Sequence, residues 1–322
     1  MKSLPKVVAI GGGTGLSVLL RGLKAKPLDI TAIVTVADDG GSSGVLRSEL
    51  QMPPPGDIRN VLAALSETEP LFEKLLQHRF QNGNGLSGHS VGNLLLAAMT
   101  SIMGDFALGV RELSRVLNVK GKVLPAANQS IVLNAIMIDG TIVEGESNIP
   151  KHSDKIDRVY LTPKDVEPLP ESLQAIREAD LIILGPGSLY TSVLPNLLVP
   201  KLGEEICKAK ARKVYICNVM TQKGETDQFT ASEHVKVLLE HIKDPCINTV
   251  IVNSQPVPVR ILKRYELEGA EPVFFDKKRL EALGVKVIDD NIIKYDQAVI
   301  RHNEKILADW IMRLLPGGGR TV

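Results

Sequence analysis

A glycine-rich turn near the N-terminus is the segment whose residue types are best suited to chemistry. The apolar run 7–10 leads directly into Gly11-Gly12-Gly13-Thr14-Gly15, and leucines at helical spacing follow from Leu16. Glycine permits backbone angles that other residues refuse, and it lets a ligand approach the main chain closely. The first turn of a helix offers free N–H groups and a partial positive charge, which favour a phosphate. The sequence therefore predicts a strand–turn–helix unit that binds a nucleotide or another phosphorylated ligand.

This turn departs from two known phosphate-binding patterns. Gly11 and Gly13 match the start of the dinucleotide pattern Gly-x-Gly-x-x-Gly, but Leu16 takes the place of its last glycine. No Lys-Ser or Lys-Thr pair closes the turn as a P-loop requires. The alternative is a tight turn that needs glycine only for its geometry, although four glycines in five positions exceed that need.

Two carboxylates follow the second predicted strand. Asp38 and Asp39 come directly after the apolar run 30–36. An acidic residue at this place can hydrogen-bond a ribose, and a carboxylate can equally hold Mg²⁺. The alternative is a solvated turn.

A second glycine turn follows a later strand. Gly185-Pro186-Gly187-Ser188 comes after the apolar run 181–184, with the hydroxyl of Thr191 beyond it, and Asn218 ends the next strand-like run. Because ligands bind at the carboxyl ends of parallel strands, we expect a phosphorylated ligand to lie across both glycine turns.

One histidine opens an apolar helix. His89 stands in Ser87-Gly88-His89-Ser90-Val91-Gly92-Asn93, directly before the run 94–98. It could act as a general acid or base, or as a hydrogen-bonding or capping residue beside the ligand. No Ser-His-Asp order, Cys-His pair or His-x-x-x-His spacing defines a catalytic set, so the catalytic residues are unknown.

The composition is that of an ordinary globular protein. The 322 residues are 44% hydrophobic with a formal net charge of +1, so no bulk charge draws the chain to nucleic acid or to a membrane. No apolar stretch reaches the roughly 18 residues that a membrane span needs, and the N-terminus leads directly into a strand rather than a signal peptide. We expect a cytoplasmic protein without a nucleic-acid partner. We also expect Cys207, Cys217 and Cys246 to be reduced packing residues.

Apolar runs that alternate with helical periodicity predict the elements that position these residues. We expect an α/β fold with one doubly wound, mainly parallel, Rossmann-like sheet in a single nucleotide-binding domain over 1–315. A helical excursion over 71–119 and a small β insertion over about 122–161 interrupt it, and a disordered tail over 316–322 follows.

The segment between the second strand and the next helix is expected to be a loop. Residues 40–56 are rich in glycine, serine and proline, and loops of this length are often functional. Asp57 is expected to cap the helix that follows.

Several stretches of the chain resemble the YvcK-type gluconeogenesis factor family of bacteria. They span most of the chain in the order of the family, and together they are specific. A more distant likeness, to 2-phospho-L-lactate transferase, rests on the Gly-Gly-Thr-Gly turn and the Ala-Asp-Asp after the second strand. The matching stretches are Gly11–Leu16, Ala37–Gly44, Pro55–Asn60, His89–Leu94, Ala179–Ser192 and Cys217–Thr221.

The resemblance implies a cytoplasmic regulatory factor required for cell shape and for growth on gluconeogenic carbon sources. It implies UDP-N-acetylglucosamine as the ligand, no obligatory cofactor, and a site that includes Tyr265 and Arg301. A tyrosine ring can stack on uracil, and a guanidinium can hold a diphosphate in its fork. The expected ligand-binding residues are Gly11, Gly12, Gly13, Thr14, Gly15, Asp38, Asp39, Ser42, Asp57, Asn60, His89, Asn93, Gly185, Gly187, Ser188, Thr191, Asn218, Tyr265 and Arg301.

Two other functions stay open. One is a transferase related to the phospholactate enzyme, with Mg²⁺ held by Asp38 or Asp39. The other is an NAD(P)-binding protein with the dinucleotide across the first glycine turn. We expect a non-catalytic regulator that signals to a protein partner of unknown identity. We also expect a homodimer, because the excursion 71–119 is rich in apolar faces.

Overall fold

A seven-stranded parallel sheet forms the centre of the molecule. The computed structural model describes residues 3–242, 246–296 and 299–317. The strand order is β10-β9-β8-β7-β1-β2-β3, and each neighbouring pair is parallel. This confirms the predicted doubly wound fold. The strands are β1 Lys6–Gly11, β2 Asp29–Val34, β3 Lys122–Pro125, β7 Leu181–Leu184, β8 Arg212–Ile216, β9 Thr249–Asn253 and β10 Lys286–Asp290.

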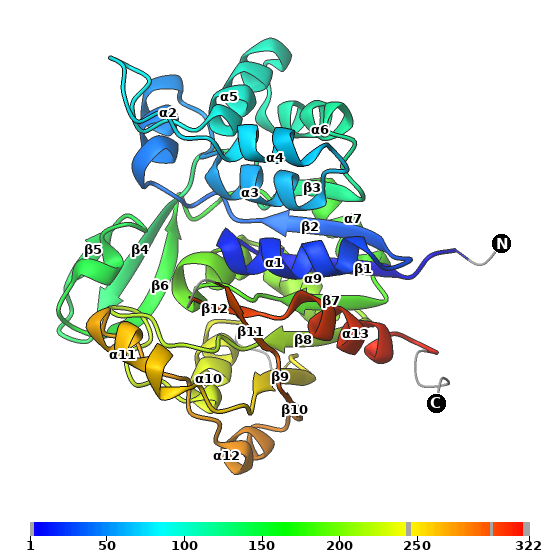
Figure 1. Cartoon of the computed structure of the whole chain (residues 1–322), viewed down its shortest axis with the longest axis vertical. Helices are drawn as coiled ribbons and strands as arrows, with labels where there is room; N and C mark the ends of the chain where they lie inside the picture. The colour runs from blue at the N-terminus through cyan, green and yellow to red at the C-terminus, as the bar shows by residue number, and fades with distance from the viewer. Residues whose placement is uncertain (1–2, 243–245, 297–298, 318–322) are drawn as a thin grey trace.

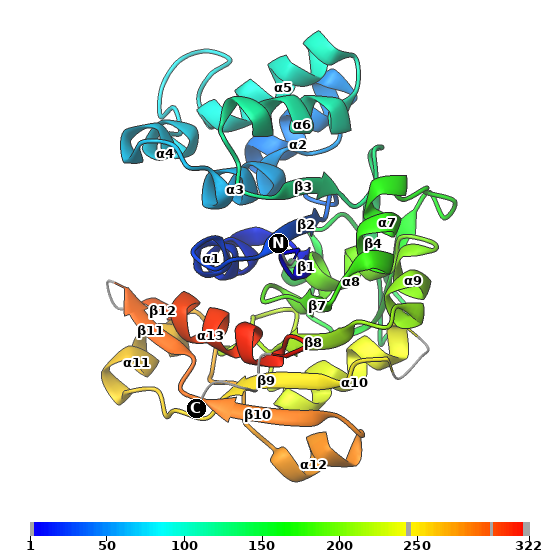
Figure 2. The same ribbon diagram turned by 90° about the vertical axis from the view of Figure 1, so that its right-hand side faces the viewer.

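Helices cover both faces of this sheet, which explains why its strands are continuous apolar runs. Figure 2 shows α1 and α13 on one side of the strands and α7, α9 and α10 on the other. β1 and β7 are buried along nearly their whole length. α11 Val259–Leu267 instead packs in a small separate core with residues such as Ile293 and Ile300. The other helices of this part of the chain are α1 Gly13–Lys24, α7 Pro170–Glu178, α8 Leu194–Leu197, α9 Leu202–Lys208, α10 Ala231–Ile242, α12 Lys277–Ala282 and α13 Glu304–Leu314.

The strand order reverses between β1 and β7. From β1 the chain proceeds to β2 and β3 on one side, and the later strands add on the other side. Ile10 of β1 pairs with Leu184 of β7, so the two glycine turns leave the sheet side by side. Such a reversal is the usual ligand crevice of an open α/β sheet.

The predicted helical excursion lies together at one end of the molecule, at the top of Figure 1. The expected loop 40–56 is wrong in part, because residues 41–50 form α2. Asp57 does not cap the next helix, since Pro55 occupies that position. The predicted excursion corresponds to α4 Pro70–Gln77, α5 Val91–Met103 and α6 Phe106–Val116, and the preceding α2 Gly41–Leu50 and α3 Gly56–Leu65 pack beside them.

The predicted β insertion is a separate antiparallel sheet with the order β5-β4-β6. Its first predicted segment, 122–125, instead joins the main sheet as β3. A second antiparallel unit, the hairpin β11–β12, was not expected from the sequence. The strands are β4 Val132–Met137, β5 Ile142–Glu144, β6 Ile156–Thr162, β11 Ile293–Asp296 and β12 Val299–His302.

The cysteine prediction is wrong for one pair. Cys207 and Cys246 form a disulfide, with Cα atoms 5.1 Å apart, because α9 ends close to the segment that enters β9. Cys217 is a free, buried packing residue, as expected. Most of the predicted tail 316–322 lies outside the described residues.

In the described parts of the chain, no single helix is long and apolar enough to cross a membrane. Only α5 and α6 taken together are long and apolar enough, and the two helices are bent by 118° relative to each other.

Candidate functional site

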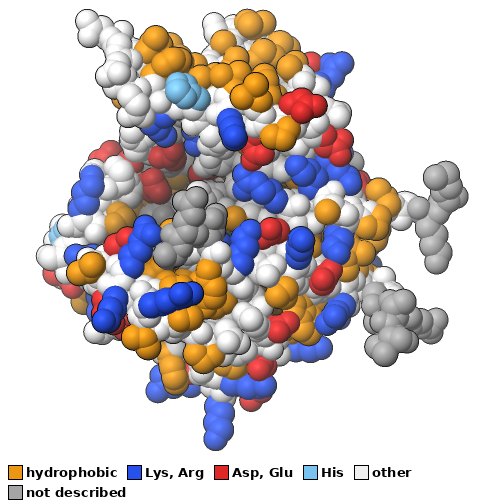
Figure 3. Space-filling view, in the orientation of Figure 1, with side chains coloured by type: hydrophobic (Ala, Val, Ile, Leu, Met, Phe, Trp, Pro, Cys, Tyr) orange, Lys and Arg blue, Asp and Glu red, His pale blue; other side chains and the backbone are white. Residues whose placement is uncertain are grey.

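A cleft of about 530 Å³ lies at the carboxyl ends of β1, β7 and β8. Both glycine turns line it, together with the segment after β8 and residues of α11 and β12. In Figure 3 this face of the molecule is hollowed between the part that carries α2–α6 and the part that carries α11. The cleft therefore occupies the place that the strand order predicts.

The first glycine turn faces a carboxylate. Gly13 has φ +66°, which favours glycine, and it opens α1 without a side-chain cap. The Gly13 N–H forms a hydrogen bond with Asp57. A Cβ on Gly12 would stand 2.3 Å from Asp57 Oδ2. The start of α1 thus already holds an anionic group of the protein.

The second glycine turn packs directly on the first. A Cβ on Gly15 would stand 2.6 Å from the carbonyl oxygen of Pro186, and a Cβ on Gly187 would stand 3.2 Å from that of Gly12. Asn196 of α8 is fully buried and donates to the Gly11 carbonyl (3.2 Å). These close approaches fix the two turns as one unit.

Neutral donors and acceptors lie beside Ser188 of the second turn. Gln222 Nε2 donates to Ser188 Oγ (2.7 Å), and Asn218 Nδ2 lies 3.4 Å from Gln222 Oε1. All three residues line the cleft. This chain of amides and a hydroxyl can recognise the polar edge of a base or the hydroxyl groups of a sugar.

Tyr265 and Arg301 line the same cleft, from α11 and β12. The Tyr265 hydroxyl accepts a hydrogen bond from the Ile300 N–H (2.8 Å), so it holds the strand that carries Arg301. Arg301 is exposed, and among the described residues it has no ion-pair partner. Its guanidinium is therefore available to an anion in the cleft.

His302 forms part of the cleft wall next to Arg301. Its Nε2 donates to the Cys217 carbonyl (3.1 Å), and burial lowers its pKa to about 4. His302 is therefore neutral at pH 7 and fixes β12 against the end of β8.

Three carboxyl groups lie around the first turn and the cleft: Glu225 is buried, and Asp57 and Glu146 are half-buried. Burial and the nearby Asp38 raise the pKa of Asp57 to about 7. Burial raises the pKa of Glu225 to about 7, against the effect of a hydrogen bond from Thr191. Burial and several carboxylates, Asp38 first, raise the pKa of Glu146 to about 8. Acids with pKa values near neutrality can exchange protons at physiological pH.

Asp38 and Asp39 are both held by backbone donors. Asp38 Oδ1 accepts from the Gly40 N–H (2.9 Å), and Asp39 Oδ1 accepts from the Ser147 N–H (2.8 Å). Asp39 therefore ties the end of β2 to the loop of the β insertion. Within the described ranges, no three His, Cys, Asp or Glu side chains are placed to hold a metal ion. Magnesium often binds through one or two carboxylates with water and phosphate oxygens, so Asp38 and Asp57 remain chemically suitable.

His89 belongs to a buried polar network behind the cleft. Its Nδ1 lies 3.0 Å from Ser42 Oγ, which accepts from Asn93 Nδ2 (3.1 Å). Arg59 donates to Ser90 Oγ (2.7 Å) and to Asn60 Oδ1 (2.8 Å). The network joins α2, α3 and α5.

The structure divides the predicted site residues into two groups. Residues that line the cleft are Gly13, Thr14, Gly15, Gly187, Ser188, Asn218, Tyr265 and Arg301. Residues outside its lining are Gly11, Gly12, Asp38, Asp39, Ser42, Asp57, Asn60, His89, Asn93, Gly185 and Thr191. The prediction of site residues missed Gln222, Glu225, Glu146 and His302. Gln222 directly follows a matched stretch, but no pattern marks the two glutamates, because only the tertiary fold buries them.

Comparison with known proteins places this geometry in a family. The family model of 2-phospho-L-lactate transferase CofD matches residues 7–293. The chain is 63% identical over 315 residues to the gluconeogenesis factor of Bacillus subtilis (strain 168), covering 98% of this chain and 99% of the relative. It is 61% identical over 310 residues to that of Halalkalibacterium halodurans, covering 96% of each.

A solved structure gives the same result. The crystal structure of a Bacillus halodurans protein of the UPF0052 family is 61% identical, with a TM-score of 0.94 over 96% of this chain and 99% of that one. Sequence and fold agree along nearly the whole chain: it belongs to the gluconeogenesis factor family, with a likeness to 2-phospho-L-lactate transferase.

Proposed function

We propose that this protein is a regulatory factor that binds UDP-N-acetylglucosamine in the cleft. The observation that carries the proposal is the joint lining of one cleft by both glycine turns, the Ser188–Gln222–Asn218 chain, Tyr265 and Arg301. A nucleotide sugar needs an anion site, a surface for its base and polar groups for its hydroxyls. The cleft supplies each of these from this chain's own residues.

The charges favour a diphosphate near Arg301 and the second turn. Arg301 offers a planar fork of donors, and Lys223 adds a second cation at the cleft wall. The Tyr265 ring gives an aromatic surface for uracil while its hydroxyl holds Ile300.

The regulatory part of the proposal comes from the relatives. Relatives that are 63% and 61% identical to this chain are called gluconeogenesis factors, and we extend growth on gluconeogenic carbon sources to it. Cell shape, a cytoplasmic location and a protein partner that responds to the bound state are further parts of the proposal. A homodimer stays a prediction, and Leu71, Leu75 and Ile102 are exposed apolar residues that a second subunit could cover.

Calorimetric titration of nucleotide-free protein tests the proposal. UDP-N-acetylglucosamine, UDP, GDP and NAD are each titrated with and without Mg²⁺, and the ligand is recovered afterwards. We expect saturable binding of UDP-N-acetylglucosamine and its recovery unchanged. Arg301→Ala should weaken this binding at least tenfold, about 1.4 kcal/mol. Arg158→Ala, at an exposed position on β6, is the control. Equal affinity of Arg301→Ala and wild type would contradict the site.

A second candidate is a Mg²⁺-dependent transferase related to the phospholactate enzyme. Two observations favour it: the family model, and the carboxyl groups Asp57 and Glu146 with pKa values near neutrality beside the first turn. If Mg²⁺ binds, Asp38 and Asp57 would hold it, and it would neutralise phosphate charge. Conversion of the nucleotide in the same titration would favour the transferase. Binding of NAD alone would favour the dinucleotide function.

A further inference from the structure

A second cavity of about 450 Å³ adjoins the cleft on the outer side of α1. Thr14, Val18 and Arg301 line both spaces, so they form a shared wall. The remaining lining comes from α1, α3, α4, β11 and α13: Ser17, Arg21, Asn60, Gln77, Lys294 and Glu304.

Cationic side chains outnumber carboxylates in this lining. Arg21, Lys294 and Arg301 stand against the single carboxylate of Glu304. Arg21 pairs with Glu73 (2.8 Å) and Lys294 pairs with Glu304 (2.5 Å). The Arg21–Glu73 pair is exposed to solvent, and such pairs contribute little free energy. The Lys294–Glu304 pair is only partly exposed, and Glu304 Oε2 is buried. An anion that enters the cavity can therefore recruit Arg21 away from Glu73, and it can bind Lys294 as a second partner beside Glu304.

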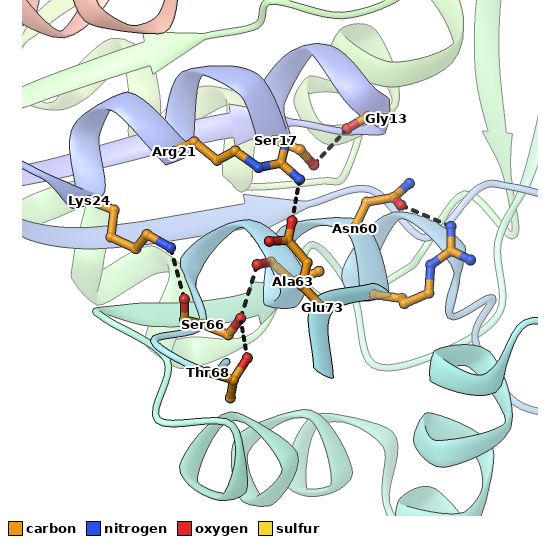
Figure 4. A network of polar contacts seen from close by, with 10 residues as sticks. Gly13, Ser17, Arg21, Lys24, Asn60, Ala63, Ser66, Thr68 and Glu73 are labelled. Carbon is orange, nitrogen blue, oxygen red and sulfur yellow. Dashed lines mark hydrogen bonds and ion pairs between the residues drawn. The ribbon is translucent and has the colours of Figure 1, made fainter. Parts of the chain in front are cut away.

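Polar groups next to the cations can recognise hydroxyl groups. Figure 4 shows Ser17 and Arg21 on α1 facing Asn60 on α3. Ser17 Oγ donates to the Gly13 carbonyl (3.1 Å), which leaves its lone pairs to accept from a ligand. Asn60 Oδ1 accepts from Arg59 (2.8 Å), which leaves the Asn60 amide N–H groups to donate.

We propose that this cavity is a second binding site, for a small phosphate monoester that carries hydroxyl groups. The phosphate would lie between Arg21, Lys294 and Arg301, with its hydroxyl groups toward Ser17 and Asn60. The sugar of a nucleotide sugar is neutral and would not need three cations. This argues against the cavity being only an extension of the cleft that holds that sugar. Because Arg301 belongs to both spaces, the two ligands are coupled: two anions share one guanidinium, so each lowers the affinity of the other a few-fold.

Titration with glycerol 3-phosphate tests this site, with and without saturating UDP to fill the cleft. We expect saturable binding at millimolar concentration or below in both conditions, a few-fold weaker with UDP. Arg21→Ala and Lys294→Ala should each weaken glycerol 3-phosphate at least fivefold and leave UDP-N-acetylglucosamine within twofold of wild type. Arg301→Ala should weaken both ligands. Glycerol and citrate serve as the neutral and carboxylate probes.

Several results would overturn the second site. The site is overturned if glycerol 3-phosphate shows no saturable binding, or if saturating UDP abolishes that binding completely. It is also overturned if citrate binds and glycerol 3-phosphate does not. Equal weakening of both ligands by Arg21→Ala would also overturn it, since the cavity would then belong to the nucleotide sugar. Arg21→Gln and thermal unfolding of each variant show whether the fold is intact. Failure of UDP-N-acetylglucosamine to bind wild type counts against the proposed function alone, because the phosphate titration does not depend on it.

Discussion

The two glycine turns of the cleft look alike in sequence but differ in their electrostatic surroundings. The first opens α1, yet Asp57 accepts the Gly13 N–H, and Asp38 and Glu146 lie near that carboxyl group. At the second, hydroxyls and amides lie beside the turn itself, with Gln222 donating to Ser188, and a carboxyl group, Glu225, accepts from the Tyr190 and Thr191 N–H groups just beyond it. A glycine turn therefore gives a ligand close access to the main chain. The charges of the neighbouring side chains determine whether an anion binds there favourably.

This difference has a consequence for the ligand. We expect the diphosphate to lie toward Ser188 and Arg301, because Arg301 and Lys223 supply cations to the cleft there. Glu225 lines the same cleft, and its pKa of about 7 allows it to be protonated when an anion binds. Placing a phosphate at the first turn requires a proton on Asp57 or a metal ion between the two anions.

The largest expected effect comes from breaking the contact between the turns. In Gly15→Ala the new Cβ would meet the Pro186 carbonyl oxygen at 2.6 Å, so backbone atoms must move. We expect at least tenfold weaker binding of UDP-N-acetylglucosamine and about 1–3 kcal/mol lower free energy of unfolding. Gly11→Ala is the matched control, because its Cβ has no contact closer than 3.7 Å. Calorimetry measures the affinity, and urea unfolding measures the free energy of unfolding. A Gly15→Ala variant with wild-type values of both would show that the two turns are independent.

The next effect concerns the proton on Asp57. Its pKa of about 7 means that raising the pH from 6 to 8 adds a negative charge beside the first turn. Without Mg²⁺ we expect wild-type affinity to fall about three- to tenfold over this range. In Asp57→Asn most of this fall should disappear, and Glu225→Gln should remove any remainder, since Glu225 titrates in the same range. A fall of the same size in both variants would show that the ligand does not sense these carboxyl groups.

A smaller effect is expected at the second turn. Ser188→Ala removes the hydroxyl that accepts from Gln222, while Asn218 still contacts the amide. We expect a loss of about 1 kcal/mol in binding, roughly fivefold, from one hydrogen bond. Ser17→Ala, on the outer side of α1, is the control and should leave the nucleotide-sugar affinity unchanged.

The smallest effect concerns stability alone. Burial and carboxylate neighbours raise the pKa of Glu146 to about 8, so the folded state favours its protonated form. This stabilisation is present at low pH and is lost as the pH rises from about 4.5 to about 8. Glu146→Gln should therefore be more stable than wild type at pH 8.5, by roughly 1–2 kcal/mol after solvent screening, and similar at pH 5. Urea unfolding at both pH values checks this, with exposed Glu144→Gln as the control.

The main sheet could be predicted because its strands are buried on both faces and therefore read as continuous apolar runs. α2 could not, because glycine and serine in 40–44 favour a loop locally. Its first turn instead depends on tertiary contacts, such as that of Ser42 with Asn93. The β11–β12 hairpin was missed because its short strands mix apolar and charged residues, whereas the equally short β7 is a continuous apolar run.

For the site, the sequence predicted the glycine turns and the end of β8, since strand ends share one edge of a parallel sheet. It did not predict that Asp57 faces Gly13, or that Glu225 is buried and Glu146 half-buried. A carboxylate in a loop resembles a solvated residue until distant segments enclose it.

Tyr265 and Arg301 stand on a hydrophobic core of their own. Val219, Val257, Ile261, Ile293 and Ile300 form a small cluster separate from the main one. A core of this size resists opening less than the main sheet does, so this segment should open locally while the rest stays folded. A bound nucleotide would slow hydrogen exchange at the Ile300 amide, which donates to Tyr265. A protein partner could then distinguish the bound from the free state by how long this segment stays closed. The central sheet need not move.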